Sequence, residues 1–450
     1  MPSDRLFGPA LTTEAMRNAT SDEAWVAAML RVEGALALAE ARVGLIPGRE
    51  AEQIAAACRA QTPDTGRLGL DAVPAGSPVV PLVKALGAAL PPEAARFVHW
   101  GATSQDIIDT AMMLIARAGL DLVAADLRGA ADAAASLADS QRATVLPGRT
   151  LLQQALPTTL GLKAAGWLVA IVEARRRLVT FRRGTLAVQL GGAVGTLASL
   201  GGRGLEVARA LGDELELAEP VVPWHASRGR IAELGSALGI AAGTMGKIAL
   251  DVALMMQTEV GEVSEPAGPG RGASSTMPHK RNPVGAVAVN ACVRGVNAQA
   301  AVLLGSLVQE HERAVGAWQA EWPAVSEALR LTAGAVARTR EMLEGLDVDA
   351  GRMRRNLEMT GGLLLSEHVM IVLAERVGLP AARELVDGAV ASAAGTGRPF
   401  RDVLLAEPAI TRHMGPADID AALDPAGYLG SADALVDRAL AAHRAEGGER

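Results

Sequence analysis

Apolar side chains return at helical spacing over several long stretches of the chain. The first stretch opens on Ser21, a residue type that caps helices, and its periodic apolar positions continue to Gly44 before Pro47 interrupts them. Long helices of this kind are expected at 21–44, after Thr103, from Pro157 toward Arg183, around 229–264 and around 283–310. The pattern predicts a protein built mainly from long amphipathic helices.

Glycine clusters separate these stretches, and the helical patterns become shorter toward the C-terminus. The clusters lie at Gly191–Gly192 with Gly195, at Gly201–Gly202, and from Gly268 to Ser275. After Pro323 the patterns are shorter, with breaks at Gly351, Gly361–Gly362, Gly378–Pro380 and Pro408. We therefore expect an all-α fold of three helical domains: an N-terminal domain at 1–104, a long central helical bundle at 105–346, and a smaller C-terminal domain at 347–450.

The composition also favours helices. Hydrophobic residues make up 50% of the 450 residues but aromatic residues only 2%, so the core must consist mainly of Ala, Leu and Val, which suit closely packed helices better than sheets. Lys and Arg number 43 against 50 Asp and Glu, which gives a net charge of −7. This balance argues against a general nucleic-acid or anionic-membrane surface, and an anionic substrate therefore needs local basic residues.

The chain carries no sign of metal binding, export or a cofactor. Cys58 and Cys292 are far apart and outside any metal-binding spacing, and the seven histidines are scattered, so neither a disulfide nor a metal site is expected. The N-terminus lacks a basic segment followed by an apolar core, and Lys163 and Glu173 interrupt the apolar helix near Trp167. We expect a cytoplasmic, cofactor-independent protein without a membrane span.

The segment from Gly272 to Pro283 gathers groups that can bind and protonate an anion. Backbone amides of a Gly/Ser-rich turn converge on negative charge, Lys280 adds a full positive charge, and Asn282 adds a neutral donor. Ser274 or Ser275 could then move the proton. The alternative is a flexible linker between helices, although such linkers rarely carry Met-Pro and Lys-Arg-Asn-Pro together.

A second polar cluster covers residues 99–106, directly before a predicted helix. The hydroxyls of Thr103 and Ser104, with nearby amides, can hold a carboxylate, and His99 is a further candidate for binding one. The structural alternatives are helix capping by Thr103 or Ser104 and a core position for His99.

At the loop, the pattern Ser-Ser-x-Met-Pro-x-Lys-x-Asn-Pro of residues 274–283 resembles the fingerprint of the fumarase/aspartase superfamily, whose members add or eliminate groups beside a carboxylate. Ser274 takes the place of the family's catalytic serine. The similarity runs from Leu6 to near Gly430. It implies three helical domains, a five-helix central bundle, and a homotetramer in which each active site takes loops from three subunits.

A third cluster, at residues 148–159, departs from that family. Arg149, Thr150 and Gln153 can contact an anion, but Leu151 and Gln154 hold positions where many lyases of the superfamily carry an acid–base histidine. A leaving group that must be protonated would therefore lack its expected donor. A reaction whose leaving group is already a carboxylate needs none.

That departure fits the bacterial 3-carboxy-cis,cis-muconate cycloisomerases, which segments 256–263 and 276–285 most resemble within the superfamily. Lactonisation is a β-elimination run backward, in which a substrate carboxylate attacks an alkene carbon and the neighbouring carbon receives a proton. The resemblance implies that Ser274 delivers this proton, while Lys280 and Asn282 stabilise the aci-carboxylate intermediate.

A tricarboxylate substrate needs further cations. Arg313 resembles a substrate-binding arginine of the superfamily, although an ion pair with Glu310 or Glu312 on a helix surface is the plain alternative. The expected substrate-binding residues are His99, Thr103, Ser104, Arg149, Thr150, Gln153, His225, Ser275, Asn282 and Arg313. His99, His225 or a water molecule could replace the missing histidines.

Two other functions remain open. The first is a lyase that releases fumarate from an amino-, nitro- or nucleotide-linked succinate. The second is a catalytically silent structural protein, which the joint presence of Ser274, Lys280 and Asn282 disfavours. The stereochemistry and regiochemistry of the addition cannot be read from the residues.

Overall fold

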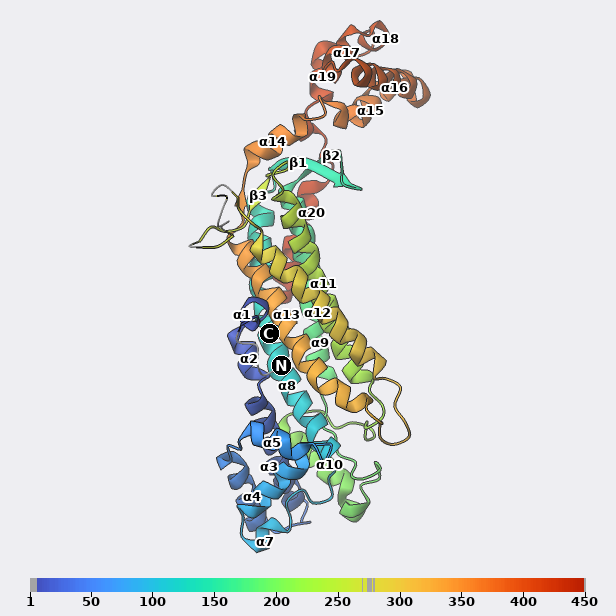
Figure 1. Cartoon of the computed structure of the whole chain (residues 1–450). Coiled ribbons are helices and arrows are strands. Elements are labelled where there is room, and N and C mark those ends of the chain that lie inside the picture. Colours follow the sequence, from blue (N-terminus) through green and yellow to red (C-terminus); the bar gives the residue numbers. More distant parts are fainter. Residues whose placement is uncertain (1–5, 269, 273–276, 278–279, 449–450) are drawn as a thin grey trace. The chain divides into compact units, whose positions relative to one another are not determined.

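The computed structural model describes residues 6–268, 270–272, 277 and 280–448, and helices dominate it (Figure 1). The expected all-α fold class is confirmed. The chain divides into two compact units, each built from three separate stretches: 1–128, 173–247 and 288–338 form the first, and 129–172, 248–287 and 339–450 form the second. The three-domain division stays a prediction.

The first unit contains a group of helices around α3 (Asp22–Arg42). Ser21 caps α3 as expected, since its hydroxyl accepts a hydrogen bond from the amide of Ala24 at 3.1 Å. Helices α4 (Gly48–Ala60) and α10 (Gly204–Leu215) pack directly on α3. The shorter helices of this unit are α1 (Gly8–Leu11), α2 (Glu14–Ala19), α5 (Thr65–Ala72), α6 (Val79–Ala88), α7 (Pro92–Ala95) and the 3-10 helix η1 (Ala198–Arg203).

Five long helices contribute residues to both units. They are α8 (Ser104–Ser140), α9 (Leu160–Gly184), α11 (Gly229–Met255), α12 (Val284–Gly305) and α13 (Ala317–Glu344). Within the first unit, small residues let them approach closely. A Cβ added at Gly295 of α12 would lie 2.5 Å from a methyl carbon of Leu331 in α13, so a larger residue there would require the leucine side chain to move.

The expected long helices are confirmed, with two corrections. The helix predicted around 229–264 ends at Met255. Turns follow at 256–260, and after Gly261, whose φ of +61° favours glycine, the chain enters strand β3 (Val263–Ser264). The expectation of only shorter helices after Pro323 is wrong. Pro323 lies inside α13, which is as long as the other bundle helices and is stabilised by its buried face rather than by every backbone hydrogen bond.

The second unit holds the small sheets and the C-terminal helices. Strands β1 (Val145–Thr150) and β2 (Gln153–Thr159) form an antiparallel hairpin with an irregularity between Pro147 and Arg149, and β3 pairs with β4 (Asp347–Val348). The remaining helices are α14 (Ala350–Glu358), η2 (Leu363–Leu365), α15 (Ser366–Val377), α16 (Leu379–Thr396), α17 (Phe400–Ala406), α18 (Pro408–Thr411), α19 (Pro416–Ala422), η3 (Pro425–Gly427) and α20 (Ala432–Gly448).

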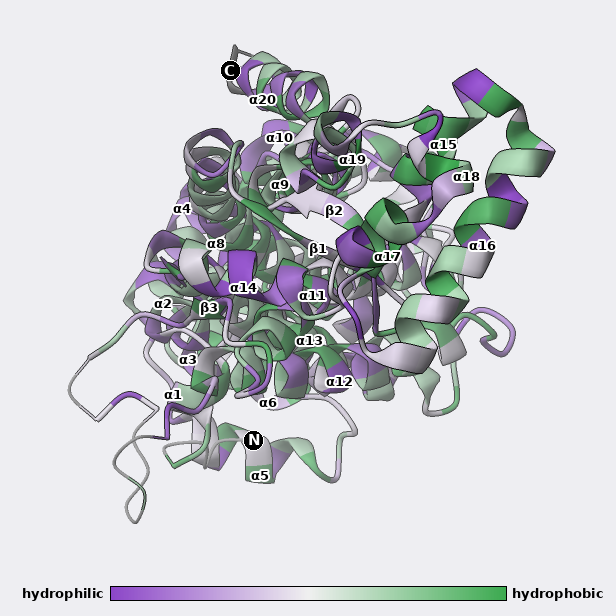
Figure 2. Ribbon diagram, turned by 90° about the horizontal axis from the view of Figure 1, so that it is seen from above, coloured by the Kyte–Doolittle hydropathy of each residue, from purple (hydrophilic) through white to green (hydrophobic). Residues whose placement is uncertain are grey.

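The C-terminal helices share an apolar core made of one face from each. Figure 2 shows hydrophilic and hydrophobic positions alternating around α16, as expected for a helix with one buried face. Phe400 is completely buried in this core. Its other fully buried members include Val369, Leu373, Ala382, Leu404, Ile410, Met414 and Ile419.

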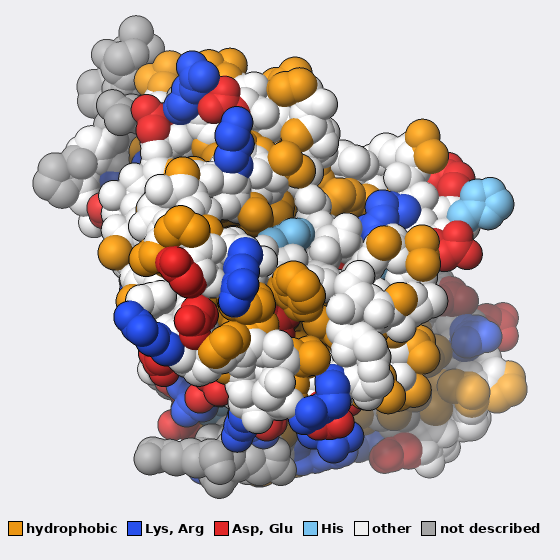
Figure 3. All heavy atoms as spheres, turned by 90° about the horizontal axis from the view of Figure 1, so that it is seen from below, with side chains coloured by type: hydrophobic (Ala, Val, Ile, Leu, Met, Phe, Trp, Pro, Cys, Tyr) orange, Lys and Arg blue, Asp and Glu red, His pale blue; other side chains and the backbone are white. Residues whose placement is uncertain are grey.

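Two of the described helices are both long and strongly apolar. By length and composition alone, α11 and α12 could cross a membrane, although no span was expected from the sequence. Apolar side chains lie exposed on both, among them Ile240, Leu250, Val287 and Leu304. On the face shown in Figure 3, acidic and basic side chains are interspersed among hydrophobic ones, which agrees with the mixed charge of the sequence. Both cysteines are free and buried.

Candidate functional site

Asp106 organises the candidate residues of the first unit, at the amino end of α8. Its carboxylate accepts hydrogen bonds from the amides of Thr103, Gly191 and Gly192, each at 3.0 Å. His225 Nε2 lies 2.7 Å from the same carboxylate. One buried carboxylate therefore joins the loop before α8, the Gly191–Gly192 loop and His225.

The hydroxyls of Thr103 and Ser104 have no hydrogen-bond partner among the described residues. Helix capping was the alternative to ligand binding for these side chains. Instead, Asp106 caps the helix by accepting from the Thr103 amide, which leaves both hydroxyls available at the positive end of the α8 dipole. This arrangement suits a carboxylate ligand.

His99 pairs with a buried acid that the sequence analysis did not single out. Its Nδ1 lies 2.7 Å from Oε1 of Glu33, a residue of α3 that is 1% exposed. Burial lowers the pKa of His99, but the hydrogen bond and charge of Glu33, together with the charge of Asp106, outweigh it and raise the pKa above its usual value of 6.5. Both acids therefore favour the cationic form of His99.

Arg313 does not form the surface ion pair that was its plain alternative. Its guanidinium donates to Oε1 of Gln105 at 2.9 Å and to the carbonyls of Gly192 and Ala193 at 3.3 and 2.7 Å. Glu310 accepts instead from the amide of Val315. Arg313 therefore ties the Gly192 loop to α8.

Below these loops lies an ionic network that the sequence analysis missed. Arg228 is fully buried and contacts Asp109 at 2.6 and 2.9 Å and Glu321 at 3.0 Å. Gln105 donates to Asp109 at 3.1 Å, so the network reaches Arg313 through that glutamine. The indole N–H of Trp318, which is buried, also donates to Asp109 at 2.9 Å.

Glu40 follows Glu33 by about two turns on the same face of α3. It is completely buried, and neither carboxylate oxygen has a hydrogen-bond partner within the described part of the chain. Burial, and secondarily the charge of Glu33, raise its pKa to about 9. The folded state therefore binds a proton at pH 7 that the unfolded chain releases, so this group lowers stability as pH rises from about 4.5 to about 9.

We predict that Glu40→Gln stabilises the protein at pH 7 by on the order of 1–3 kcal/mol, because the unfolded chain no longer gains free energy by ionising this group. Chemical unfolding across pH 5–9 measures the effect, and the variant should lose stability less steeply than the parent. Glu52→Gln, at an exposed position of α4, is the control and should leave the pH dependence unchanged. Equal slopes for parent and Glu40→Gln would contradict the assignment.

In the second unit, Arg149 is already paired. From strand β1 it contacts the carboxylate of Glu262 through both guanidinium nitrogens, at 2.6 and 2.9 Å, and Glu262 is completely buried. Asn356 of α14 donates to the same carboxylate at 2.8 Å. The positive charge expected to meet a substrate is thus neutralised within the chain.

The tip of the hairpin presents Thr150 and Gln153, both exposed, on either side of two leucines. Leu151 and Leu152 have φ values of +51° and +66°, and their side chains are 97% and 76% exposed. Both conformations are strained for a leucine, and neither side chain can transfer a proton.

The base of the fingerprint loop is fixed at both ends. Asn282 donates through its backbone and side-chain amides to the carbonyl of Gly272, at 2.9 and 3.2 Å. Gly272 has a φ of +66°, and an added Cβ would lie 2.6 Å from the Asn282 carbonyl oxygen, so glycine is required. Glu265 caps α12 by accepting from the amides of Gly285 and Ala286.

Lys280 is exposed, and no described residue pairs with its ammonium group. Ser274 and Ser275 lie outside the described residues, so the catalytic serine stays a prediction. The structure therefore gathers His99, Thr103, Ser104, His225 and Arg313 in the first unit, and Arg149, Thr150, Gln153, Lys280 and Asn282 in the second.

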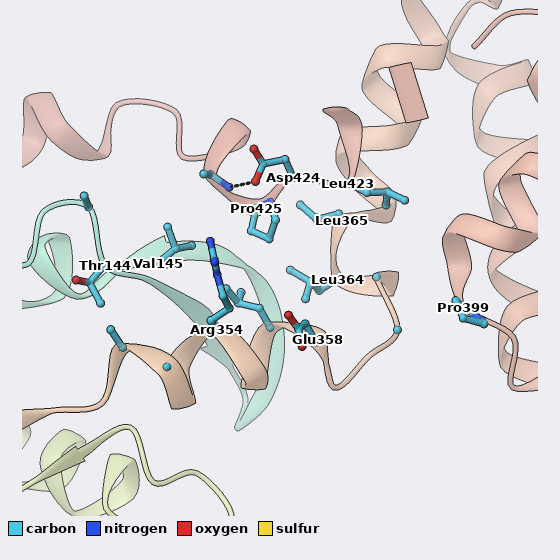
Figure 4. Close-up of a pocket in the computed structure, with 17 residues that line it drawn as sticks. Thr144, Val145, Arg354, Glu358, Leu364, Leu365, Pro399, Leu423, Asp424 and Pro425 are labelled. Atoms are coloured by element: carbon cyan, nitrogen blue, oxygen red, sulfur yellow. Dashed lines mark hydrogen bonds between the residues drawn. The ribbon is translucent and has the colours of Figure 1, made fainter. Parts of the chain in front are cut away.

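A pocket of about 780 Å³ in the second unit is lined by none of these residues (Figure 4). The labelled side chains of Val145, Leu364, Leu365 and Leu423 surround it, and Arg354 and Glu358 of α14 point toward it. Its lining is mostly apolar, and no predicted site residue contributes to it.

Sequence reasoning missed the acids that hold the candidate residues, namely Glu33, Asp109, Glu262 and Glu321. A usable signal existed for two of them. Glu33 and Asp109 interrupt otherwise apolar helical stretches, and a charged residue at such a position requires a partner.

Comparisons with known proteins agree along the whole chain. The family model described as "Lyase" matches residues 9–298, and that described as "Adenylosuccinate lyase C-terminus" matches residues 362–439. A 3-carboxy-cis,cis-muconate cycloisomerase of Bradyrhizobium diazoefficiens is 48% identical over 97% of this chain and 97% of its own. A nitrosuccinate lyase of Streptomyces davaonensis is 46% identical over 97% of this chain and 94% of its own. The crystal structure of 3-carboxy-cis,cis-muconate lactonizing enzyme from Pseudomonas putida superimposes with a TM-score of 0.93 at 44% identity, covering 99% of this chain and 100% of that one.

Proposed function

This chain belongs to the lyase family of the fumarase/aspartase superfamily, and from that membership we propose that it converts 3-carboxy-cis,cis-muconate to a carboxymuconolactone. The observation that carries the proposal is the 48% identity to a cycloisomerase over almost the full length of both chains. The absence of histidine at Leu151 and Gln154 supports the same reaction, which has no leaving group to protonate. We place the activity in the cytoplasmic breakdown of aromatic acids through the β-ketoadipate pathway.

In the proposed reaction, an oxygen of the distal substrate carboxylate forms a bond to the alkene carbon that bears the 3-carboxy group. The electron pair of that double bond moves into the neighbouring carboxylate, giving an aci-carboxylate. Lys280 and Asn282 stabilise this charge, and the hydroxyl of Ser274 then gives its proton to carbon. No cofactor takes part in this scheme. Because both reacting groups belong to one molecule, holding the diene folded supplies much of the rate.

The carboxylates are bound, in this proposal, by the two clusters described above. Thr103 and Ser104 offer unpartnered hydroxyls at the amino end of α8, and Thr150, Gln153 and Ser275 offer further polar groups. Arg149, His225 and Arg313 were expected as direct ligands. We propose that they also hold the site in shape, since Arg149 pairs with Glu262, His225 with Asp106, and Arg313 with the Gly192 loop.

A nitrosuccinate lyase activity is the second candidate, favoured by the 46% identical relative of that name. Nitrite leaves as a stable anion, so this elimination, like lactonisation, needs no acid at Leu151 or Gln154. Release of fumarate from nitrosuccinate distinguishes it from the leading proposal.

The test is the ultraviolet absorbance of 3-carboxy-cis,cis-muconate with purified protein, because lactonisation destroys the conjugated diene. We expect rapid loss of absorbance with the diene and no more than slow fumarate release from nitrosuccinate. The reverse result would replace the leading proposal with the second one.

We also propose that the chain forms a homotetramer with shared active sites. The exposed apolar faces of α11 and α12 support this, since copies packed there would remove them from water, and a soluble bundle rarely leaves such helices uncovered. Light scattering should give four times the 46.3 kDa mass of one chain.

A further inference from the structure

Glu33 is a buried carboxylate with one hydrogen-bond partner among the residues that the structure describes. It lies in the apolar helix α3, and its Oε1 contacts His99 Nδ1 at 2.7 Å, while Oε2 has no partner in the described part of the chain. Burying a carboxylate without compensation costs several kcal/mol, so an acid at this position needs the imidazole. Packing alone would be served better by an apolar residue.

His99 is held in a fixed orientation by its backbone as well as by Glu33. Its φ is +60°, an uncommon conformation for a residue other than glycine. Two residues later, Gly101 has a φ of +70°, and an added Cβ would lie 2.4 Å from a methyl carbon of Leu200. The loop is therefore tightly packed where it leads into Thr103 and Ser104.

With Nδ1 committed to Glu33, the nitrogen left for a ligand is Nε2. No described residue pairs with Nε2, and the side chain keeps 20% of its surface exposed. The charged groups that face this imidazole are Glu33 on α3 and Asp106 on α8. Both favour its cationic form, close to the positive end of the α8 dipole.

The proposed substrate carries three carboxylates, and the site needs positively charged groups to bind them. The two arginines that the sequence offered for a tricarboxylate are engaged, Arg149 by Glu262 and Arg313 by Gln105 and two carbonyls. His99, whose cationic form Glu33 and Asp106 favour, is a further group for binding a carboxylate in the loop that leads into Thr103 and Ser104.

We propose that Glu33 is a positioning residue that holds His99 so that Nε2 binds a carboxylate group of the substrate at the amino end of α8. This rests on the proposed function for the identity of the substrate, but not for the geometry. Glu33 acts through His99 and does not itself touch the substrate.

The test compares Glu33→Gln with Glu40→Gln. Both variants replace a buried acid of α3 by its amide, but Glu40 has no hydrogen-bond partner among the described residues and is already protonated at pH 7. For Glu33→Gln we expect KM to rise about tenfold, which corresponds to 1.4 kcal/mol, with kcat changed about twofold or less. The alkaline limb of kcat/KM should move to lower pH, because a neutral partner no longer supports the imidazolium. Glu40→Gln should show neither effect.

Two measurements keep the outcome independent of turnover. Titration of His99 by NMR should show its pKa lowered in Glu33→Gln and unchanged in Glu40→Gln. Binding of tricarballylate, a saturated tricarboxylate that cannot react, should weaken about tenfold only in Glu33→Gln. If the parent fails to consume the muconate but both of these results hold, the proposed function is wrong and the role of Glu33 stands.

His99→Asn provides a second route if Glu33→Gln folds poorly, since asparagine tolerates a positive φ. It should weaken tricarballylate binding as Glu33→Gln does, and the double variant should lose no more than either single one. An unchanged His99 titration in Glu33→Gln, or equal weakening of binding in Glu33→Gln and Glu40→Gln, overturns the proposal.

Discussion

Arg228→Met is expected to lower the free energy of unfolding by about 3–5 kcal/mol, because it leaves two buried carboxylates without their positive partner. Arg228, Asp109 and Glu321 are all fully buried, and the arginine contacts both acids through its guanidinium. Burial raises the pKa of Glu321, and Arg228 opposes that effect. Loss of the arginine should therefore make the protein least stable at alkaline pH, where both acids must stay charged or bind protons from dilute solution.

The measurement is chemical unfolding at one fixed protein concentration, since subunit association would also contribute to the apparent stability. Arg209→Met is the matched control. Arg209 is 70% exposed and pairs with Glu219 at 3.1 Å, and an ion pair of this kind contributes about 0–1 kcal/mol. Arg228→Lys, which keeps the charge but loses the fork geometry, should fall between the two. Equal losses in Arg228→Met and Arg209→Met would show that the buried network does not stabilise the fold.

Helix periodicity was sufficient to predict the fold class and most of the long helices, because amphipathic spacing over twenty or more residues leaves few alternatives. It failed at Pro323, where local propensity favours a break but the buried face of α13 keeps the helix intact. It also missed the β1–β2 hairpin, whose two-leucine turn lacks the Asn-Gly or Gly-Gly residues that usually mark such turns.

The candidate site was predictable in its residue types but not in its contacts. The clustered hydroxyls and amides at residues 99–106 and 272–283, together with Lys280, predict anion binding at both loops. What the sequence could not show is that Glu262 neutralises Arg149, or that Glu33 holds His99, since these pairs join residues 113 and 66 positions apart. Only the packed chain determines which cations stay free for a ligand.

Ser274→Ala is expected to lower kcat for lactonisation by about 10²–10⁴-fold, the usual range for loss of a general acid. The loss should be large because no other side chain is expected to give the proton to carbon. Leu151 and Gln154 cannot give a proton, His225 Nε2 is committed to Asp106, and His99, whose Nδ1 is committed to Glu33, is proposed to bind a substrate carboxylate. The change removes one oxygen atom and adds no bulk, so the loop should keep its anchors at Gly272 and Asn282.

Ser275→Ala is the matched control, because it removes the same group one residue away. If Ser275 only binds substrate, its loss should raise KM by about 10- to 150-fold, since one hydrogen bond to a charged group contributes about 1.5–3 kcal/mol. In that case kcat should stay within about tenfold of the parent. Turnover in deuterated water also tests whether the proton delivered to carbon comes from a group that exchanges with solvent. A serine hydroxyl exchanges in this way and should place deuterium in the new C–H bond of the lactone. Equal kcat in Ser274→Ala and the parent would remove Ser274 from the proton transfer, whereas a large loss in Ser275→Ala alone would transfer the role to its neighbour.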